Sequence, residues 1–74
     1  MVEVRIFGTL WEHLEPSLEL DLQGRDVAVV DLLAHLGIEP AQVGIVTIDG
    51  RLYNLDEIVP ATCRICIFQP MFGG

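Results

Sequence analysis

The sequence contains no lysine, and this absence limits the partners that the protein can bind. The 74 residues carry 4 basic side chains, all of them arginine, against 11 aspartates and glutamates, which gives a formal net charge of −7 at pH 7. Because proteins bind nucleic acids through basic side chains that neutralise phosphates, we expect no nucleic-acid partner. A chain this short has room for one hydrophobic core, so residues 1–74 are expected to form a single domain.

Cysteines and long apolar runs are also scarce. Cys63 and Cys66 are too few and too close together to cross-link a small secreted domain, which favours a reducing compartment. The first residues alternate apolar and charged side chains, whereas a signal peptide has a basic start and an unbroken apolar run. The longest uncharged stretch near the C-terminus, residues 65–74, is about half as long as a membrane span. These features predict a cytoplasmic protein that does not associate with membranes.

Several segments have the periodicity of β-strands. Apolar and polar side chains alternate in residues 2–8 and 17–22, and β-branched residues dominate residues 44–48. The turn signal Asp49-Gly50 follows directly, so residues 51–53 are expected to pair back briefly. Residues 63–68 form the last expected strand.

One segment has helical periodicity instead. From Val29 onward, apolar residues recur at i, i+3, i+4 and i+7, and Gly37 follows at the position of a left-handed C-cap. Residues 29–36 are therefore predicted to form a short amphipathic helix. Its start is weak, because Ala28 stands where Ser, Thr or Asp would cap the helix.

Two connecting segments carry apolar side chains that we expect to pack on the core. The connection over residues 9–16 is longer than a tight turn and contains Trp11, which we interpret as a partly buried anchor. The loop over residues 55–62 is expected to bury Leu55 and Ile58.

The order strand, strand, helix, strand, short strand, strand favours a two-layer α+β domain. In this β-grasp arrangement, one helix covers one face of a mixed sheet of four to five strands. The alternation predicts which side chains are buried between helix and sheet: Val2, Val4, Ile6, Leu18, Leu20, Leu22, Val29, Leu32, Leu33, Leu36, Val46, Ile48, Ile65 and Ile67.

The C-terminal segment 69–74 ends in Gly73 and Gly74 and has the greatest functional content. Without side chains, such an end can thread a narrow channel and present a bare carboxylate, and six extended residues reach about 20 Å. A carboxylate is a poor electrophile, so acyl chemistry requires activation, most simply as a mixed anhydride with AMP. The chain has neither a glycine-rich phosphate cradle nor a lysine, so a partner enzyme would have to activate it. A frayed end with incidental glycines is the alternative.

Four segments together resemble the MoaD/ThiS family of ubiquitin-like sulfur carriers. They are Val-Arg-Ile-Phe-Gly at 4–8, Asp-Leu-Leu at 31–33 with the following Leu36-Gly37, Ile-Asp-Gly at 48–50, and the ending Ile-Cys-Ile-Phe-Gln-Pro-Met-Phe-Gly-Gly at 65–74. The resemblance spans nearly the whole chain. The ending is more similar to that of MoaD, the small subunit of molybdopterin synthase, than to that of ThiS.

The resemblance implies a ubiquitin-like β-grasp domain with a flexible Gly-Gly tail, acting as a protein cosubstrate rather than an enzyme. A ubiquitin-activating-type adenylyltransferase, similar to MoeB or ThiF, would use ATP to adenylate Gly74, and the chain itself would bind no cofactor. A sulfur donor such as a cysteine desulfurase or a rhodanese would convert the adenylate to a thiocarboxylate. The acceptor would be the large subunit of molybdopterin synthase, similar to MoaE, or thiazole synthase in the ThiS branch. Phe72 and Gln69 depart from the small residue and the proline common at these positions.

A candidate docking patch lies on the sheet face opposite the helix. The alternation that places Ile6 and Ile67 inside turns Phe7 and Phe68 outward, with Ile45 and Cys66 on the same face. We interpret these four residues as an apolar surface for the activating enzyme or the acceptor, with scattered exposed aromatics as the alternative. The expected partner-binding residues also include three from the tail: Pro70, Met71 and Phe72.

Metal or redox chemistry is not expected. Cys63 and Cys66 have a Cys-x-x-Cys spacing, but residues three apart in a strand point to opposite faces, so their sulfur atoms would not meet. His13 and His35 are too few and too scattered to complete a metal site.

Three functions remain open. The first is a sulfur carrier that cycles Gly74 through adenylate and thiocarboxylate. The second is a ubiquitin-like modifier conjugated through Gly74 to lysines of other proteins; without lysine, the chain could not build lysine-linked polymers of itself. The third is a binding module that uses Phe7 and Phe68 with no covalent chemistry at the tail.

Overall fold

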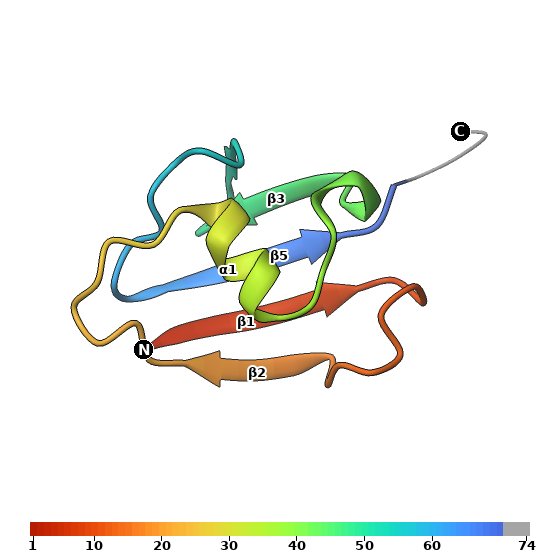
Figure 1. Cartoon of the computed structure of the whole chain (residues 1–74), viewed down its shortest axis with the longest axis horizontal. Coiled ribbons are helices and arrows are strands. Elements are labelled where there is room, and N and C mark those ends of the chain that lie inside the picture. Colours follow the sequence, from red (N-terminus) through yellow and green to blue (C-terminus); the bar gives the residue numbers. More distant parts are fainter. Residues whose placement is uncertain (71–74) are drawn as a thin grey trace.

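The structure is a computed structural model that describes residues 1–70, and it confirms the α+β prediction. A five-stranded mixed sheet with the strand order β2-β1-β5-β3-β4 is covered on one face by one helix, which is the ubiquitin-like β-grasp fold (Figure 1). The elements are β1 (Val2–Phe7), β2 (Ser17–Leu20), α1 (Val29–His35), the 3-10 helix η1 (Pro40–Gln42), β3 (Ile45–Ile48), β4 (Arg51–Tyr53) and β5 (Cys63–Phe68).

The central strands β1 and β5 run parallel, with Val2 opposite Cys63 and Phe7 opposite Phe68. Strand β3 is antiparallel to β5 and begins with Ile45 opposite Phe68. The last residues of β1 and β5 and the first residue of β3 therefore lie side by side at one end of the strands, which we call the tail end of the sheet. The N-terminus lies at the opposite end of the strands, which we call the distal end (Figure 1).

Helix α1 begins without a side-chain cap, as predicted from Ala28. Backbone carbonyls of the loop before β5 take the place of a cap: the N–H of Val29 donates to the carbonyl of Glu57 and that of Val30 to the carbonyl of Leu55, both at 2.9 Å. At the other end, Gly37 has a positive φ of 76°, and the N–H of Ile38 donates to the carbonyl of Leu33 at 2.9 Å. This Schellman motif confirms the expected left-handed C-cap.

The same loop corrects one prediction about the core. Leu55 and Ile58 are exposed, and Val59 is buried instead. The loop docks through its backbone, because its carbonyls serve the helix N-terminus and the N–H of Val59 donates to the carbonyl of Val27 at 2.8 Å. Ile58 pairs with Ala28 in an isolated bridge and its side chain points outward. Successive side chains in extended backbone point to opposite sides, so that of Val59 points inward.

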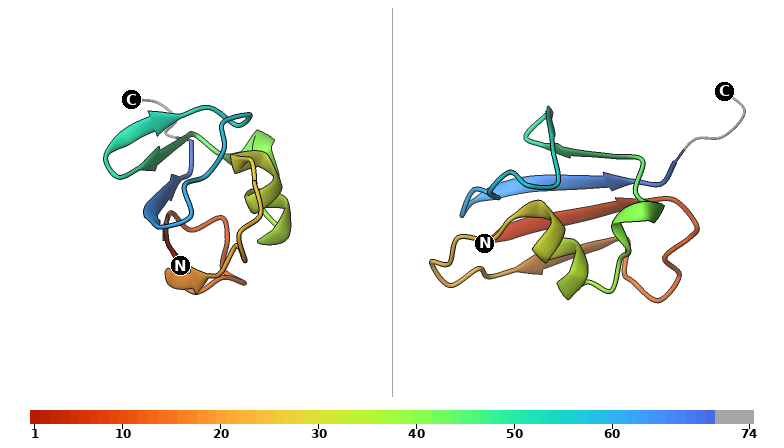
Figure 2. Two further views of the ribbon diagram at one scale, coloured as in Figure 1. Left: turned by 90° about the vertical axis from the view of Figure 1, so that its left-hand side faces the viewer. Right: turned by 45° about the horizontal axis from the view of Figure 1, so that its top comes forward.

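The second strand is shorter than predicted and less buried. It ends at Leu20, because Asp21 accepts a hydrogen bond from the N–H of Gln23 at 2.9 Å and Gln23 adopts a positive φ of 56°, which together start a turn. Strand β2 lies at the sheet edge, beyond full cover by α1 (Figure 2). The predicted core residues Leu18, Leu20 and Leu22 are therefore only partly buried against the core.

The other predicted core residues are buried, and Trp11 is buried more completely than expected. Ile38, Val59 and Cys63 also join the core without having been predicted there. The turn after β3 is confirmed as a hairpin, because Asp49 and Gly50 have φ values of 50° and 84°, the positive pair of a type I′ turn. In the described residues, no helix is long and apolar enough to span a membrane.

Candidate functional site

The residues expected to carry the chemistry follow the end of β5. That strand ends at Phe68 on the tail end of the sheet, and Gln69 and Pro70 continue the chain from it as half-buried residues. Four predicted site residues, Met71, Phe72, Gly73 and Gly74, lie outside the described residues. The part of the site that the structure describes is therefore the surface around the root of this segment.

An aromatic pair marks that surface. Phe7 and Phe68 are register partners on the parallel strands β1 and β5, so their side chains emerge from the same face opposite α1. Their rings stack with centroids 4.8 Å apart and an interplanar angle of 10°. Stacked rings bury part of each other's surface, yet Phe7 remains 44% exposed.

Ile45 extends the pair onto β3, where it is the register partner of Phe68 and is 49% exposed. Cys66 lies one step toward the distal end, between Arg5 and Thr47. We call Phe7, Phe68, Ile45 and Cys66 the apolar patch. The structure brings these four predicted residues together on the outer face of the sheet.

The structure also identifies an exposed apolar residue that the sequence analysis missed. Leu52 on β4 is the register partner of Thr47, which pairs with Cys66 in turn, so Leu52 extends this face toward the sheet edge. Its exposed fraction is 64%. The three-residue strand is too short for an alternation to assign its faces, and the pairing of Thr47 with Leu52 is what does so.

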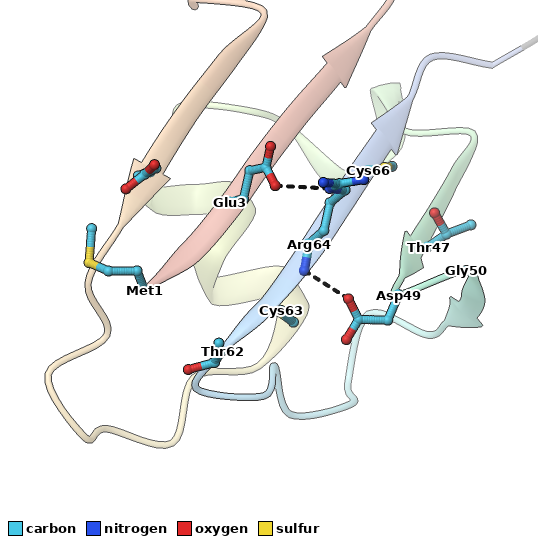
Figure 3. A pocket seen from close by; sticks show the side chains of 10 residues that line it. Met1, Glu3, Thr47, Asp49, Gly50, Thr62, Cys63, Arg64 and Cys66 are labelled. Carbon is cyan, nitrogen blue, oxygen red and sulfur yellow. Dashed lines mark hydrogen bonds and ion pairs between the residues drawn. The ribbon is translucent and has the colours of Figure 1, made fainter.

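The distal end of the same face is charged. Glu3 accepts a hydrogen bond from Arg64 at 2.9 Å, and Asp49 accepts one from the N–H of Arg64 at 3.0 Å (Figure 3). Glu3 also accepts a hydrogen bond from Arg5 at 3.1 Å. The hydrogen bond from Arg64, followed by that from Arg5, holds the pKa of the Glu3 carboxyl below its ordinary value. Glu3, Asp49 and Arg64 line an open depression of about 850 Å³.

The two cysteines point to opposite faces, as the strand periodicity predicts. Cys63 is buried and its thiol lies 3.4 Å from the carbonyl of Pro60, whereas Cys66 is partly exposed on the outer face, and both are free. Burial raises the pKa of the Cys63 thiol, which leaves it protonated and unreactive. Across residues 1–70, no three His, Cys, Asp or Glu side chains are grouped as metal ligands.

The comparisons with known proteins cover nearly the whole chain. The family model described as the ThiS family matches residues 4–74. The crystal structure of SAMP1 from Haloferax volcanii is similar, with 26% sequence identity and a TM-score of 0.70 over 99% of this chain and 98% of that chain. No curated protein matches the chain.

The fold and these similarities define a class, that of the ubiquitin-like sulfur carriers and modifiers, whose members are carriers rather than enzymes. Within this class, the chain belongs to the ThiS family. Membership implies partnership with adenylyltransferases of the ubiquitin-activating type and with sulfur-transfer enzymes.

Proposed function

We propose that the protein is a sulfur carrier that delivers sulfur as a thiocarboxylate on Gly74. In the first step, a carboxylate oxygen of Gly74 attacks the α-phosphorus of ATP on the partner adenylyltransferase, and pyrophosphate leaves. In the second step, the terminal sulfur of a cysteine persulfide on a cysteine desulfurase or a rhodanese attacks the acyl carbon, and AMP leaves. A thiol then attacks the donor cysteine sulfur of the resulting acyl disulfide, which releases the thiocarboxylate on Gly74 and leaves the donor cysteine in a disulfide with that thiol. Both enzymes are partners, and the carrier supplies the carboxylate and the surface that they recognise.

The observation that carries this proposal is the position of the apolar patch. Phe7, Phe68 and Ile45 meet at the tail end of the sheet, where β5 continues toward the Gly-Gly ending. A partner that covers these side chains gains apolar contact area directly beside the segment on which it acts. The acidic remainder of the chain, with its net charge of −7, favours a partner with a basic surface.

For the recipient of the sulfur, we propose the large subunit of a molybdopterin synthase, into which Pro70, Met71, Phe72, Gly73 and Gly74 would insert. The support is the ending Phe-Gln-Pro-Met-Phe-Gly-Gly, which resembles that of MoaD. Thiazole synthase is the alternative recipient. Mass spectrometry of the purified thiocarboxylated carrier, before and after incubation with each acceptor, decides between them, because only the true acceptor consumes the thiocarboxylate.

A reducing cytoplasm is the compartment we propose for this cycle. Cys63 and Cys66 are both free in the structure. A thiocarboxylate is itself readily oxidised, so a reducing compartment preserves the product.

Mass spectrometry of the C-terminal peptide tests the proposal. The protein is purified from its native cells with thiols trapped by alkylation, and the peptide is fragmented, because sulfur in place of oxygen changes the mass almost as much as oxidation of Met71. We expect an alkylated thiocarboxylate on Gly74. An isopeptide bond between Gly74 and a lysine of another protein would instead establish the modifier function.

Deletion of Gly74 provides the matched functional test. We expect the shortened protein to keep the fold, because the deletion lies beyond the sheet, and to lose sulfur transfer completely. Transfer at an unchanged rate would rule out the carrier chemistry. Unchanged affinity for a partner together with an exclusively free carboxylate would favour the plain binding module.

A further inference from the structure

The chain leaves β5 through a narrow passage between two glycines. Gly8 directly follows β1 and Gly44 directly precedes β3, and these two strands flank β5. Gln69, the first residue after β5, therefore has a glycine on each side. We call Gly8, Gly44 and Gln69 the tail-root clamp.

Close approach of the backbone explains the glycine at position 44. A Cβ atom there would lie 2.8 Å from the carbonyl oxygen of Gln69 and 2.9 Å from the Cα of Pro70. Both are backbone atoms, which cannot rotate away as the end of a side chain can. Gly44 does not have a positive φ, so the space occupied by Gln69 and Pro70 is the reason that position 44 lacks a side chain.

Gly8 faces the other side of Gln69. Its φ of 137° is in the region that favours glycine, and a Cβ atom would overlap the side-chain amide of Gln69. Nothing lies within 4 Å of the Cβ position at Gly24 or Gly50, which have positive φ values in turns remote from the tail end. Gly8 is thus required by its backbone conformation, and a side chain there would also displace the amide of Gln69 from its place.

Hydrogen bonds hold Gln69 between these glycines. Its N–H donates to the carbonyl of Phe7 at 3.1 Å, and its side-chain Oε1 accepts from the N–H of Thr9 at 2.9 Å. On the other side, the N–H of Gly44 donates to the carbonyl of Phe68 at 2.8 Å. A proline at position 69 would lack both the N–H and the Oε1. Glutamine therefore holds this position by hydrogen bonds to the last residue of β1 and to the loop after it, where a proline would do so by the stiffness of its ring.

We propose that the tail-root clamp is a positioning device, in which Gln69 sets the direction of the chain beyond β5 relative to the apolar patch. The inference rests on the proposed function, because the direction matters only if Gly74 must reach a reactive centre. For a partner docked on Phe7 and Phe68, the chain toward Gly74 then always starts at the same place and in the same direction relative to the docking surface. When the direction varies, a smaller fraction of docked carriers is competent, and the apparent affinity falls by that fraction.

The experiment measures ATP–pyrophosphate exchange by an adenylyltransferase of the ubiquitin-activating type from the same genome, with the full-length carrier as the varied substrate. Gln69→Ala removes the acceptor for Thr9, whereas Gln69→Glu keeps a carboxylate oxygen in its place. Gln42→Ala, at an exposed glutamine of η1, is the matched control. Losing one hydrogen bond is expected to raise the KM for the carrier about fivefold in Gln69→Ala, with kcat unchanged, and Gln69→Glu is expected to restore it.

Gly44→Ala tests the other side of the clamp. We expect a larger increase in KM, about tenfold, because backbone atoms must move to admit the Cβ. Gly50→Ala is its control: it strains a turn of positive φ without meeting any neighbour. Amide hydrogen exchange at Thr9 is measured in parallel and is expected to be faster in Gln69→Ala than in the wild type and Gln69→Glu.

Each outcome decides the proposal. A wild-type KM in Gln69→Ala overturns the clamp while the carrier function stands, and so does a KM in Gln69→Glu as high as in Gln69→Ala. A fall in kcat that tracks a lower melting temperature indicates a structural role and also overturns it. If the wild type itself supports no exchange, the proposed function fails and the positioning role fails with it, while protection of Thr9 still reports whether the hydrogen bond exists.

Discussion

The outer face of the sheet differs sharply between its two ends. At the distal end, β1 and β5 place Glu3 opposite Arg64, and at the tail end the same two strands place Phe7 opposite Phe68. The first pair is an ion pair at 2.9 Å in solvent, and the second is a stacked aromatic pair. Both face away from α1, so the burial of the core imposes neither choice.

The two pairs have different roles: the charged pair keeps the face soluble, and the aromatic pair makes it specific for a partner. An exposed ion pair contributes little stability, because water solvates both charges in the absence of the pair. An exposed aromatic stack leaves apolar surface in contact with water, which is unfavourable. A partner that covers the rings removes this surface from water and gains binding free energy. The aromatic pair adjoins the point where the chain leaves β5, and the charged pair does not. The functional surface is therefore expected at the tail end of this face and not at the distal end.

The largest expected effect is the loss of adenylation by the partner enzyme when a charged side chain is introduced at the tail end. Phe68→Asp and Ile45→Asp are each expected to lower kcat/KM for pyrophosphate exchange about 30-fold or more, because burial of the carboxylate in the docked complex is unfavourable. Ile45→Asp alters a side chain that is already 49% exposed, so it tests docking with little risk to the fold. Circular dichroism checks the fold of both variants. Unchanged exchange kinetics in both folded variants would refute the docking role.

A smaller effect on stability is expected from removing one ring of the aromatic pair. Phe7→Ala should lower the free energy of unfolding by about 1 kcal/mol through the lost stacking, as measured by urea denaturation. Phe7→Leu is the matched control, because it keeps an apolar side chain without a ring. If Phe7→Leu and Phe7→Ala are equally destabilised, the ring contributes through stacking; if Phe7→Leu equals the wild type, apolar contact alone accounts for the effect.

Removing a positive charge from the distal end should leave adenylation of the carrier nearly unchanged. Arg64→Ala removes one of the two arginine partners of Glu3, and we expect its kcat/KM for pyrophosphate exchange to change by less than about twofold. Comparison with Ile45→Asp under identical conditions gives the contrast between the two ends directly. A loss as large as that of Ile45→Asp would show that docking extends over the whole face and would remove the distinction drawn above.

The smallest expected effect is a pH dependence that originates at Glu3. Arg64 and Arg5 hold the pKa of this carboxyl in the folded protein below its ordinary value of 4.5. Because the folded pKa is the lower one, the contribution to stability is fully present above pH 4.5 and is lost as the pH falls through the folded pKa. Urea denaturation should show a small difference between the wild type and Glu3→Gln at pH 7 that disappears at low pH. A difference that grew on acidification would have the wrong sign for this mechanism.

The core of the fold was predictable where periodicity determines the face of a side chain. In β1 and β5, alternation correctly identified Val4 and Ile65 as buried and Phe7 and Phe68 as turned away from the helix. Alternation failed at β2, because it reports which face a side chain occupies and not how far the helix extends above it. Leu18 and Leu20 point toward the core but lie at the uncovered edge.

The site was predictable in composition but less so in its connections. The patch residues follow from alternation in three strands, but the contact of Ile45 with Phe68 depends on the pairing of β3 with β5, whose register no local pattern specifies. Gln69 was noticeable only as a departure from proline. Its role at Gly8 and Gly44 was not visible, because the three residues come from segments far apart in the chain.

The sequence by itself determined the strands, the helix with its Gly37 end, and the hairpin at Asp49-Gly50, because each depends on periodicity or on a local backbone conformation. The tertiary structure alone decided how the helix begins, where carbonyls of Leu55 and Glu57 replace the missing cap. It also decided how the chain leaves β5, where two glycines that adjoin the flanking strands leave room for Gln69. Both arrangements bring together atoms distant in the sequence, and such contacts form only when the sheet has assembled.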